Sequence, residues 1–247
     1  MSGPRAVVAQ ARTELLLAFR QGEQLLVSLG VPLGILVFFA KVDVLPKGDV
    51  HRPIDFLTPA VLSLAVMSSA MVSLGIGTGF ERYYGVLKRL GTTPLGRPRL
   101  IAAKIGAVLV TELLQFVVLI GAGRALGWEP TAGWGAAVLA TLLGTAAFAG
   151  IGLFLAGTLP GPLNLAACNG LYLLLLVTGG MMVPFEKLPH ALRAVAEVLP
   201  AAALSNIIIG SLATGGKVHV DGAAWIVLVA WAVLMPTIAA WRFRWEP

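Results

Sequence analysis

The stretch FERYYGVLKRLGTTPLGRPRLIAAK, residues 80–104, decides the fold because it divides two long apolar runs with a charged segment. Residues 56–80 carry no charged side chain, and Glu112 is the only acid in residues 101–123. A helix needs about 20 residues to cross a hydrocarbon core of roughly 30 Å. The sequence therefore predicts two membrane-spanning helices joined by a polar loop.

The composition agrees with a membrane protein. The chain of 247 residues is 57% hydrophobic and 12% charged, whereas soluble domains carry about 25% charged residues. Its mean hydropathy is +0.87. Cys168 is the single cysteine, which excludes a disulfide framework and a cysteine-based zinc site.

The uncharged runs predict an all-α, polytopic membrane protein with one transmembrane domain, residues 1–247, and six transmembrane helices. Residues 130–185 contain no charge and are too long for one helix, but TLPGPLN at 158–164 would break them, because proline and glycine end helices. The predicted spans are residues 24–40, 56–80, 101–123, 133–157, 163–183 and 222–241.

The distribution of charge predicts the orientation. With the N-terminus inside, the inner segments hold 11 Lys/Arg and 4 acids, and the outer loops hold 7 of each. Positive charge marks the cytoplasmic side, so both termini are predicted to be cytoplasmic. Residues 198–216 are uncharged but contain Pro200 and Asn206, and a seventh crossing there would move the C-terminus outside. We expect a re-entrant or interfacial external segment instead.

Two segments have the spacing of amphipathic helices. Before the first span, Val8, Ala11, Leu15 and Phe19 lie on one helical face, which predicts an N-terminal interfacial helix, or else the cytoplasmic start of the first span. In residues 81–90 one face is apolar and the other charged. This second segment predicts either a short docking helix beneath the bilayer or a solvated loop whose charges set the topology. Its apolar face would hold Tyr83, Val86, Leu87 and Leu90.

Two motifs resemble those of a known family. Glu81-Arg82, Gly85, Leu87, Arg89-Leu90, Thr93-Pro94 and Lys104 are similar to the first cytoplasmic loop of type 2 ABC-exporter permeases, the transmembrane subunits of drug, antibiotic or lipid exporters. GGMMVP at 179–184, then Leu-Pro at 188–189 and 199–200, resembles the family's segment after the fifth span. After Pro200 the family often has polar or aromatic residues, whereas this chain has Ala-Ala-Ala-Leu.

The resemblance implies a subunit of an ATP-driven exporter in the plasma membrane. Two permease subunits, identical or sibling, would rest on two copies of a separate ABC ATPase, which would bind the ATP and Mg. This chain would bind no cofactor and no nucleic acid, and would contact membrane lipids. The residues implied to couple it to the ATPase are Glu81, Arg82, Tyr84, Leu87, Lys88, Arg89 and Leu90, and the external segment would contain Pro184, Pro189 and Pro200.

The sequence also lacks a nucleotide-binding motif, which agrees with a separate ATPase subunit. The sequence contains no G-x-x-x-x-G-K-[ST] phosphate loop, so we expect the ATPase to be another polypeptide. The apolar spans favour a hydrophobic or amphipathic substrate, such as a drug-like compound or a lipid, moved outward.

Several polar or small residues inside the spans are candidates for a subunit interface or a substrate path. Glu112 must face the bundle interior, where it would contact substrate or protons, or join an internal hydrogen-bonded cluster, which is the favoured interpretation. Small residues at four-residue intervals in the second span would let another helix approach closely, within the subunit or across subunits. The full set is Ser69, Ser73, Gly77, Glu112, Asn169 and Tyr172.

Other classes of protein fit the sequence less well. An intramembrane enzyme would need a Ser–His pair or a metal cluster, and all three histidines lie in predicted outer loops. A proton-coupled secondary transporter using Glu112 would be expected to show inverted repeats. A membrane scaffold is the third alternative.

Overall fold

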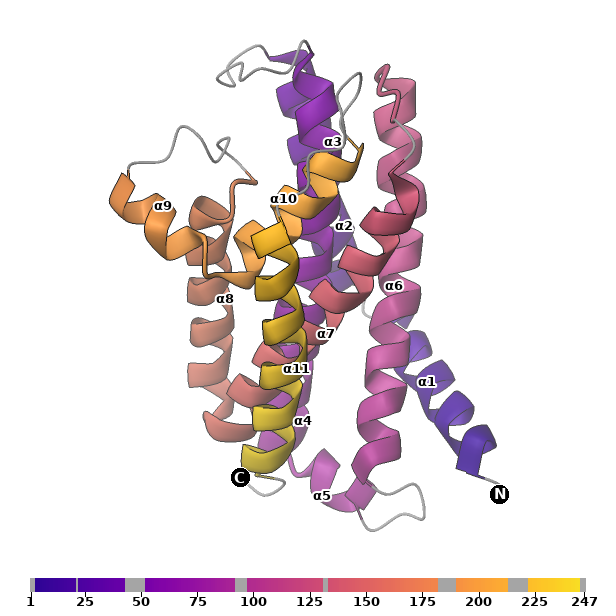
Figure 1. Cartoon of the computed structure of the whole chain (residues 1–247). Helices are drawn as coiled ribbons and strands as arrows, with labels where there is room; N and C mark the ends of the chain where they lie inside the picture. The colour runs from indigo at the N-terminus through magenta and orange to yellow at the C-terminus, as the bar shows by residue number, and fades with distance from the viewer. Residues whose placement is uncertain are drawn as a thin grey trace.

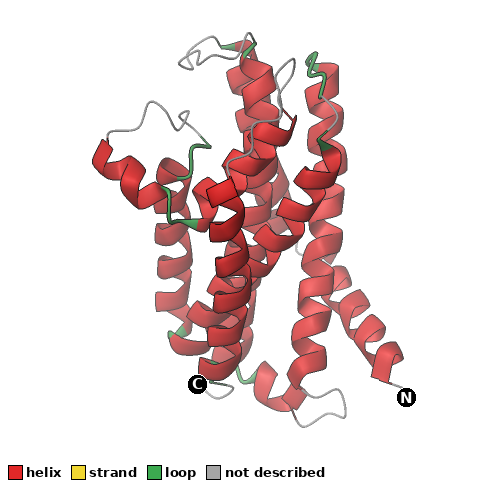
Figure 2. Ribbon diagram, viewed as in Figure 1, coloured by secondary structure: helices red, strands yellow, loops and turns green. Residues whose placement is uncertain are grey.

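The computed structural model describes residues 3–20, 22–42, 52–91, 97–130, 133–181, 190–212 and 222–244. Every regular element in these residues is helical (Figures 1 and 2), which confirms the all-α prediction. The elements are α1 (Gly3–Arg20), α2 (Gly22–Lys41), α3 (Pro53–Met67), the π-helical segment η1 (Ser68–Ser73), α4 (Leu74–Tyr83), α5 (Val86–Gly91), α6 (Arg97–Ala125), α7 (Trp134–Thr158), α8 (Gly161–Thr178), α9 (His190–Ala196), α10 (Pro200–Leu212) and α11 (Gly222–Arg242).

Within these residues, five helices are long and apolar enough to cross a membrane. They are the continuous helix Pro53–Tyr83, made of α3, η1 and α4, and the helices α6, α7, α8 and α11. Each agrees within a few residues with a predicted span. The first predicted span corresponds to α2, whose apolar part Ser28–Lys41 is shorter, so the six-span topology stays a prediction.

The outward faces of the bundle are apolar. Leu113 and Val117 on α6, Leu173 on α8 and Ile226 on α11 are each at least 60% exposed. A soluble monomer rarely exposes apolar patches of such extent, because each would favour aggregation. In a bilayer the same side chains contact lipid tails, so the exposure supports membrane embedding.

The helix α7 is the centre of the packing. It contacts α3, η1, α4, α8, α10 and α11. Glycines allow these close approaches: a Cβ on Gly150 would lie 2.5 Å from the backbone nitrogen of Pro236 in α11, and a Cβ on Gly152 would lie 2.6 Å from the carbonyl oxygen of Met71 in η1. Small residues at helix interfaces are how helices pack tightly in a membrane.

The segment after α8 is packed in part into the bundle. The short helix α9 and the oblique helix α10 follow the fifth span, and α10 packs against α3, α7 and α11 (Figure 1). All of Ala201 to Leu204 is at most 4% exposed, so these residues fill the core. Pro200 begins α10, whereas Pro184 and Pro189 lie outside the described residues. A short, buried helix agrees with a segment that does not cross the membrane.

The start of α1, the end of α11 and the loop helix α5 lie at the same end of the bundle (Figure 1). Helix α1 ends at Arg20 and helix α2 begins at Gly22. That α1 lies in the membrane interface stays a prediction.

The close contact of α7 with η1 predicts an unusual substitution effect. In an exposed helix Gly→Ala is favourable by up to about 1 kcal/mol, but at Gly152 the new methyl would collide with backbone. We expect Gly152→Ala to destabilise the fold by about 1–3 kcal/mol. Gly135→Ala in the same helix meets nothing within 4 Å and should be neutral or stabilising. Thermal unfolding of both variants in detergent measures the difference, and equal melting temperatures would contradict this packing.

Candidate functional site

The second long helix is the continuous helix Pro53–Tyr83 that follows α2. The loop that joins it to α6 includes two helical pieces with a turn between them. The helix α4 ends at Tyr83, the chain turns at Tyr84 and Gly85, and α5 begins at Val86. Gly85 has φ = 72°, in the left-handed region that glycine adopts without steric cost. The expectation of one continuous helix over residues 81–90 is therefore wrong, because this turn interrupts it.

Arg82 is buried and fastens the end of α4 to the end of α7. Its side chain is 5% exposed, and its Nη1 donates to the carbonyl oxygen of Gly157 at 2.9 Å. Its Nη2 donates to the carbonyl oxygen of Leu159. The last carbonyls of a helix lack partners within the helix and carry partial negative charge, so a guanidinium there is favourable. Arg82 thus holds the loop from the side of α7.

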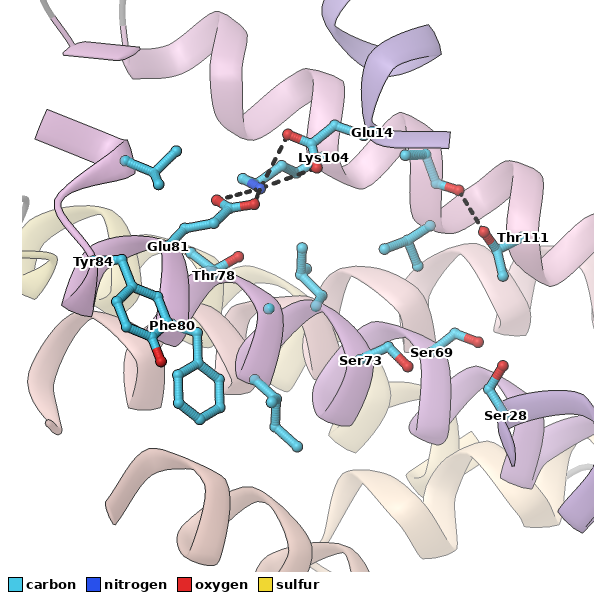
Figure 3. A pocket seen from close by; sticks show the side chains of 16 residues that line it. Glu14, Ser28, Ser69, Ser73, Thr78, Phe80, Glu81, Tyr84, Lys104 and Thr111 are labelled. Atoms are coloured by element: carbon cyan, nitrogen blue, oxygen red, sulfur yellow. Dashed lines mark hydrogen bonds and ion pairs between the residues drawn. The ribbon is translucent and has the colours of Figure 1, made fainter. Parts of the chain in front are cut away.

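Glu81 holds the loop from the opposite side. The Lys104 Nζ, on α6, lies 2.7 Å from Glu81 Oε2 and 3.1 Å from Glu14 Oε1 of α1 (Figure 3). The Lys104 side chain is only 4% exposed. A buried cation needs compensating charge, so this carboxylate–lysine–carboxylate cluster joins α1, α4 and α6. Sequence reasoning quoted Lys104 for the family resemblance but gave neither it nor Glu14 a structural role.

The exposed surface of the loop differs from the predicted docking face. Leu87 was predicted to dock on a partner, but it is 1% exposed and belongs to the chain's own core. Tyr84 is 69% exposed and Val86 is 40% exposed. Lys88 and Arg89 are exposed as well, and Leu90 is half-buried. The outward surface is therefore aromatic and basic, while Glu81, Arg82 and Leu87 serve the internal packing.

A cavity of about 590 Å³ opens beside this loop, between α1, α2, the second long helix and α6. Ser69, Ser73 and Gly77 from the predicted set line it. The Glu81–Lys104 pair and Tyr84 lie at one end, and Ser28, Ser69 and Ser73 lie toward the other (Figure 3). The structure thus brings the small-residue face and the start of the loop at residues 81–91 to one cavity.

The π-helical segment helps to keep the small residues on one wall. Residues four apart drift around an α-helix of 3.6 residues per turn, whereas the wider turn of a π-helix reverses that drift. Ser69 and Ser73 lie within η1, and Gly77 follows one turn later. The Ser69 hydroxyl also donates to Gln115 Oε1 at 2.7 Å, and the Gln115 amide donates to the Ser28 carbonyl at 3.1 Å. These bonds join α2, η1 and α6 at the end of the cavity that lies away from the loop.

Glu112 lies apart from the cavity. It is 2% exposed, and the Thr145 hydroxyl of α7 lies 2.7 Å from its Oε2. Its Oε1 has no hydrogen-bond partner among the described residues. This geometry agrees with the internal hydrogen-bonded interpretation, because Glu112 does not line the cavity that Ser69, Ser73 and Gly77 share.

The remaining predicted residues lie on α8, away from the others. Asn169 is exposed and its amide donates to the Leu165 carbonyl of its own helix at 3.0 Å, while Tyr172 is half-buried. Neither lines the cavity. Asn164 is the polar anchor of this helix: it is fully buried and its amide donates to the Gly75 carbonyl at 2.9 Å. The sequence shows that Asn164 is polar, but it does not indicate that Asn164 bonds to Gly75 in α4.

The sequence profile of the ABC-2 type transporter family matches residues 5–213. The match covers most of the chain, so the chain belongs to the ABC-2 type transporters. It is a membrane-spanning permease component of an ABC transporter and not the ATPase, and membership implies association with an ABC ATPase. No curated protein matches the sequence.

The fastening role of Arg82 can be tested directly. Arg82→Gln removes two hydrogen bonds from a charged donor, one to the Leu159 carbonyl and one to the Gly157 carbonyl, which also accepts from the Arg244 N–H. We expect a loss of about 2–4 kcal/mol in stability, seen as a lower melting temperature and a poorer yield of monodisperse protein. Arg12→Gln, a matched change at an exposed position on α1, should have little effect. An Arg82→Gln protein as stable as the Arg12→Gln control contradicts the assignment.

Proposed function

We propose that this permease is the membrane subunit of an ATP-driven exporter that moves an amphipathic substrate outward. Two permease subunits, identical or sibling, work with two copies of a separate ATPase that binds ATP and Mg. Residues 84–90 receive the motion of the ATPase. The attachment of this loop on two sides, through Arg82 and through Glu81, is the observation that carries the proposal.

That attachment suits a segment which transmits movement. Arg82 joins the loop to the end of α7, and Lys104 joins Glu81 to α6 and α1. A partner pushing on α5 would therefore displace three other helices together, because buried charge-assisted bonds do not yield independently. The exposed Tyr84, Lys88 and Arg89 are the surface proposed to meet the ATPase.

The face of α8 is proposed to meet the second permease subunit. Like α6 and α11, this helix is mostly exposed within the chain, with 28% of its most apolar window buried. Asn169 is exposed on it in the middle of a membrane span. An amide facing lipid tails is costly, so a neighbouring subunit or a hydrated path is a better environment for Asn169 than lipid.

Six crossings with both termini cytoplasmic complete the proposal. The arrangement of α1, α5 and the end of α11 at one end of the bundle supports an even number of crossings (Figure 1). The positive charge of residues 81–100 and of Arg242 and Arg244 supports the cytoplasmic assignment of that end.

Reversing the charge of the loop surface tests the coupling. We expect Lys88→Glu combined with Arg89→Glu to reduce co-purification of the ATPase at least about tenfold, since like charges or lost pairs at an interface cost several kcal/mol. The permease itself should still purify as a folded, monodisperse protein. Arg124→Glu, at an exposed position at the other end of α6, is the control. Normal recovery of the complex from the double variant argues against this surface.

Accessibility of single cysteines tests the topology. In a Cys168→Ala background, Glu197→Cys and Gly216→Cys should react with an impermeant maleimide added to intact cells. Arg89→Cys should react only after permeabilisation. If Gly216→Cys also needs permeabilisation, residues 198–216 cross the membrane and the six-span topology is incorrect.

A further inference from the structure

The cavity beside the coupling loop has a charged end, where the charges of the described residues do not cancel. Glu14 and Glu81 supply two carboxylates, and Lys104 supplies one ammonium group between them. With both acids ionised, the cluster carries a net charge of about −1. The Glu14 side chain is 15% exposed and the Glu81 side chain is 26% exposed, so both are largely shielded from solvent. An uncompensated negative charge at the edge of a membrane span is costly unless water or a cation meets it.

A second feature at the same end is an unpaired hydroxyl. Thr78 lines the cavity one turn before Glu81 on α4 and is 2% exposed. Its Oγ1 has no hydrogen-bond partner among the described residues. Figure 3 shows this oxygen directed toward the side of the cavity where Glu81 and Lys104 meet. A buried hydroxyl without a partner costs about 1–3 kcal/mol, so its position favours a ligand or water that bonds to it.

The rest of the lining is suited to an apolar body. Leu74, Ile76 and Val108 contribute side chains along the cavity, with Phe80 and Tyr84 near the loop. The volume of about 590 Å³ lies within the range of small-molecule sites. A molecule that fits would have an apolar portion along these residues and a polar group at the carboxylate end.

From this arrangement we infer that the cavity binds amphipathic cations that carry an ammonium group. The ammonium group donates to Glu14, Glu81 and the Thr78 hydroxyl, and neutralises the excess negative charge. The apolar portion lies toward Leu74 and Val108. An anionic head group is rejected, because it meets two carboxylates and finds Lys104 already bonded to both.

This inference rests on the proposed export function, since it names the class of substrate. It also links cargo to coupling, because Glu81 belongs both to the cavity and to the segment that leads into α5. A bound cation competes with Lys104 for Glu81 and so alters the attachment of the loop at the moment when substrate is present.

The test is equilibrium binding to the full chain in lipid nanodiscs, without ATPase or nucleotide. The probes are radiolabelled dodecylammonium and dodecyl sulfate, which share a chain and differ in head-group charge. Empty nanodiscs measure partition into lipid. We expect saturable binding of dodecylammonium above that background and no saturable binding of dodecyl sulfate.

The variants separate a ligand site from a purely structural ion pair. Glu14→Gln should weaken dodecylammonium binding about tenfold, and Thr78→Val, which keeps the shape of the side chain, about three- to tenfold. Lys104→Met makes the cluster more negative, so a folded Lys104→Met protein should bind the cation at least as well as the parent. Glu197→Gln, the same chemical change on an exposed acid outside the cavity, should have no effect.

Saturable binding that is equal for both probes, or unchanged by both Glu14→Gln and Thr78→Val, overturns the inference. Loss of cation binding in a folded Lys104→Met protein also overturns it, because the cluster then only tethers helices. Thr78→Val leaves the ion pairs intact and keeps the test decisive if a charge variant fails to fold. The ATPase plays no part in this measurement, so a negative result here leaves the export proposal standing, and loss of ATPase association would leave this site standing.

Discussion

The structure depends on how closely other helices can approach α7. Inside a bilayer, apolar side chains gain little from meeting one another rather than lipid, so contact between backbones must supply the attraction. Gly150 and Gly152 bring α11 and η1 against α7, and Gly144 and Gly157 receive Leu204 of α10 and Phe243 after α11. The position of the second long helix, and therefore of the loop that follows it, is set by this packing.

The charged groups near the loop have different tasks although they lie close in the sequence. Arg82 bonds to backbone carbonyls at the end of α7, which is a neutral but polar target. Lys104 instead bonds to two carboxylates on two other helices. The first arrangement leaves the guanidinium charge in place to balance the helix end, whereas the second leaves an excess carboxylate. The same short segment therefore contains a fixed attachment and a group that can exchange partners.

Much of the fold could be predicted from the sequence because the bilayer imposes a simple rule. Residues 56–80 and 133–157 had to be helical, since uncharged runs of that length cannot leave backbone groups unpaired in hydrocarbon. The break at residues 158–164 followed from its prolines, and the observed helices α7 and α8 end and begin there. The family could likewise be inferred from motifs that each belong to a loop or a helix end.

The details of the site could not be predicted in the same way. Helical periodicity put Leu87 beside Tyr83 on a docking face, but a left-handed glycine at Gly85 changes the direction of the chain and turns Leu87 into the core. Glu14 and Lys104 are 90 residues apart, and no local pattern indicates that they meet. Thr78 looked like an ordinary residue of a span, because an unpaired hydroxyl is a property of the surroundings.

The π-helical segment in the second long helix sets the angular relation between its two halves. The first half, α3, is packed in the core, and the second half, α4, carries Glu81 and Arg82 to their partners. A π-helix turns by only about 80° per residue, so the six residues of η1 turn about as far as five residues of an α-helix. One residue fewer in η1 would let the helix continue as an α-helix, with α3 and α4 in nearly the same relation, whereas one residue more in α4 before Glu81 would turn Glu81 and Arg82 by about 100° away from α6 and α7. In this helix the place of an insertion or deletion therefore matters as much as its length.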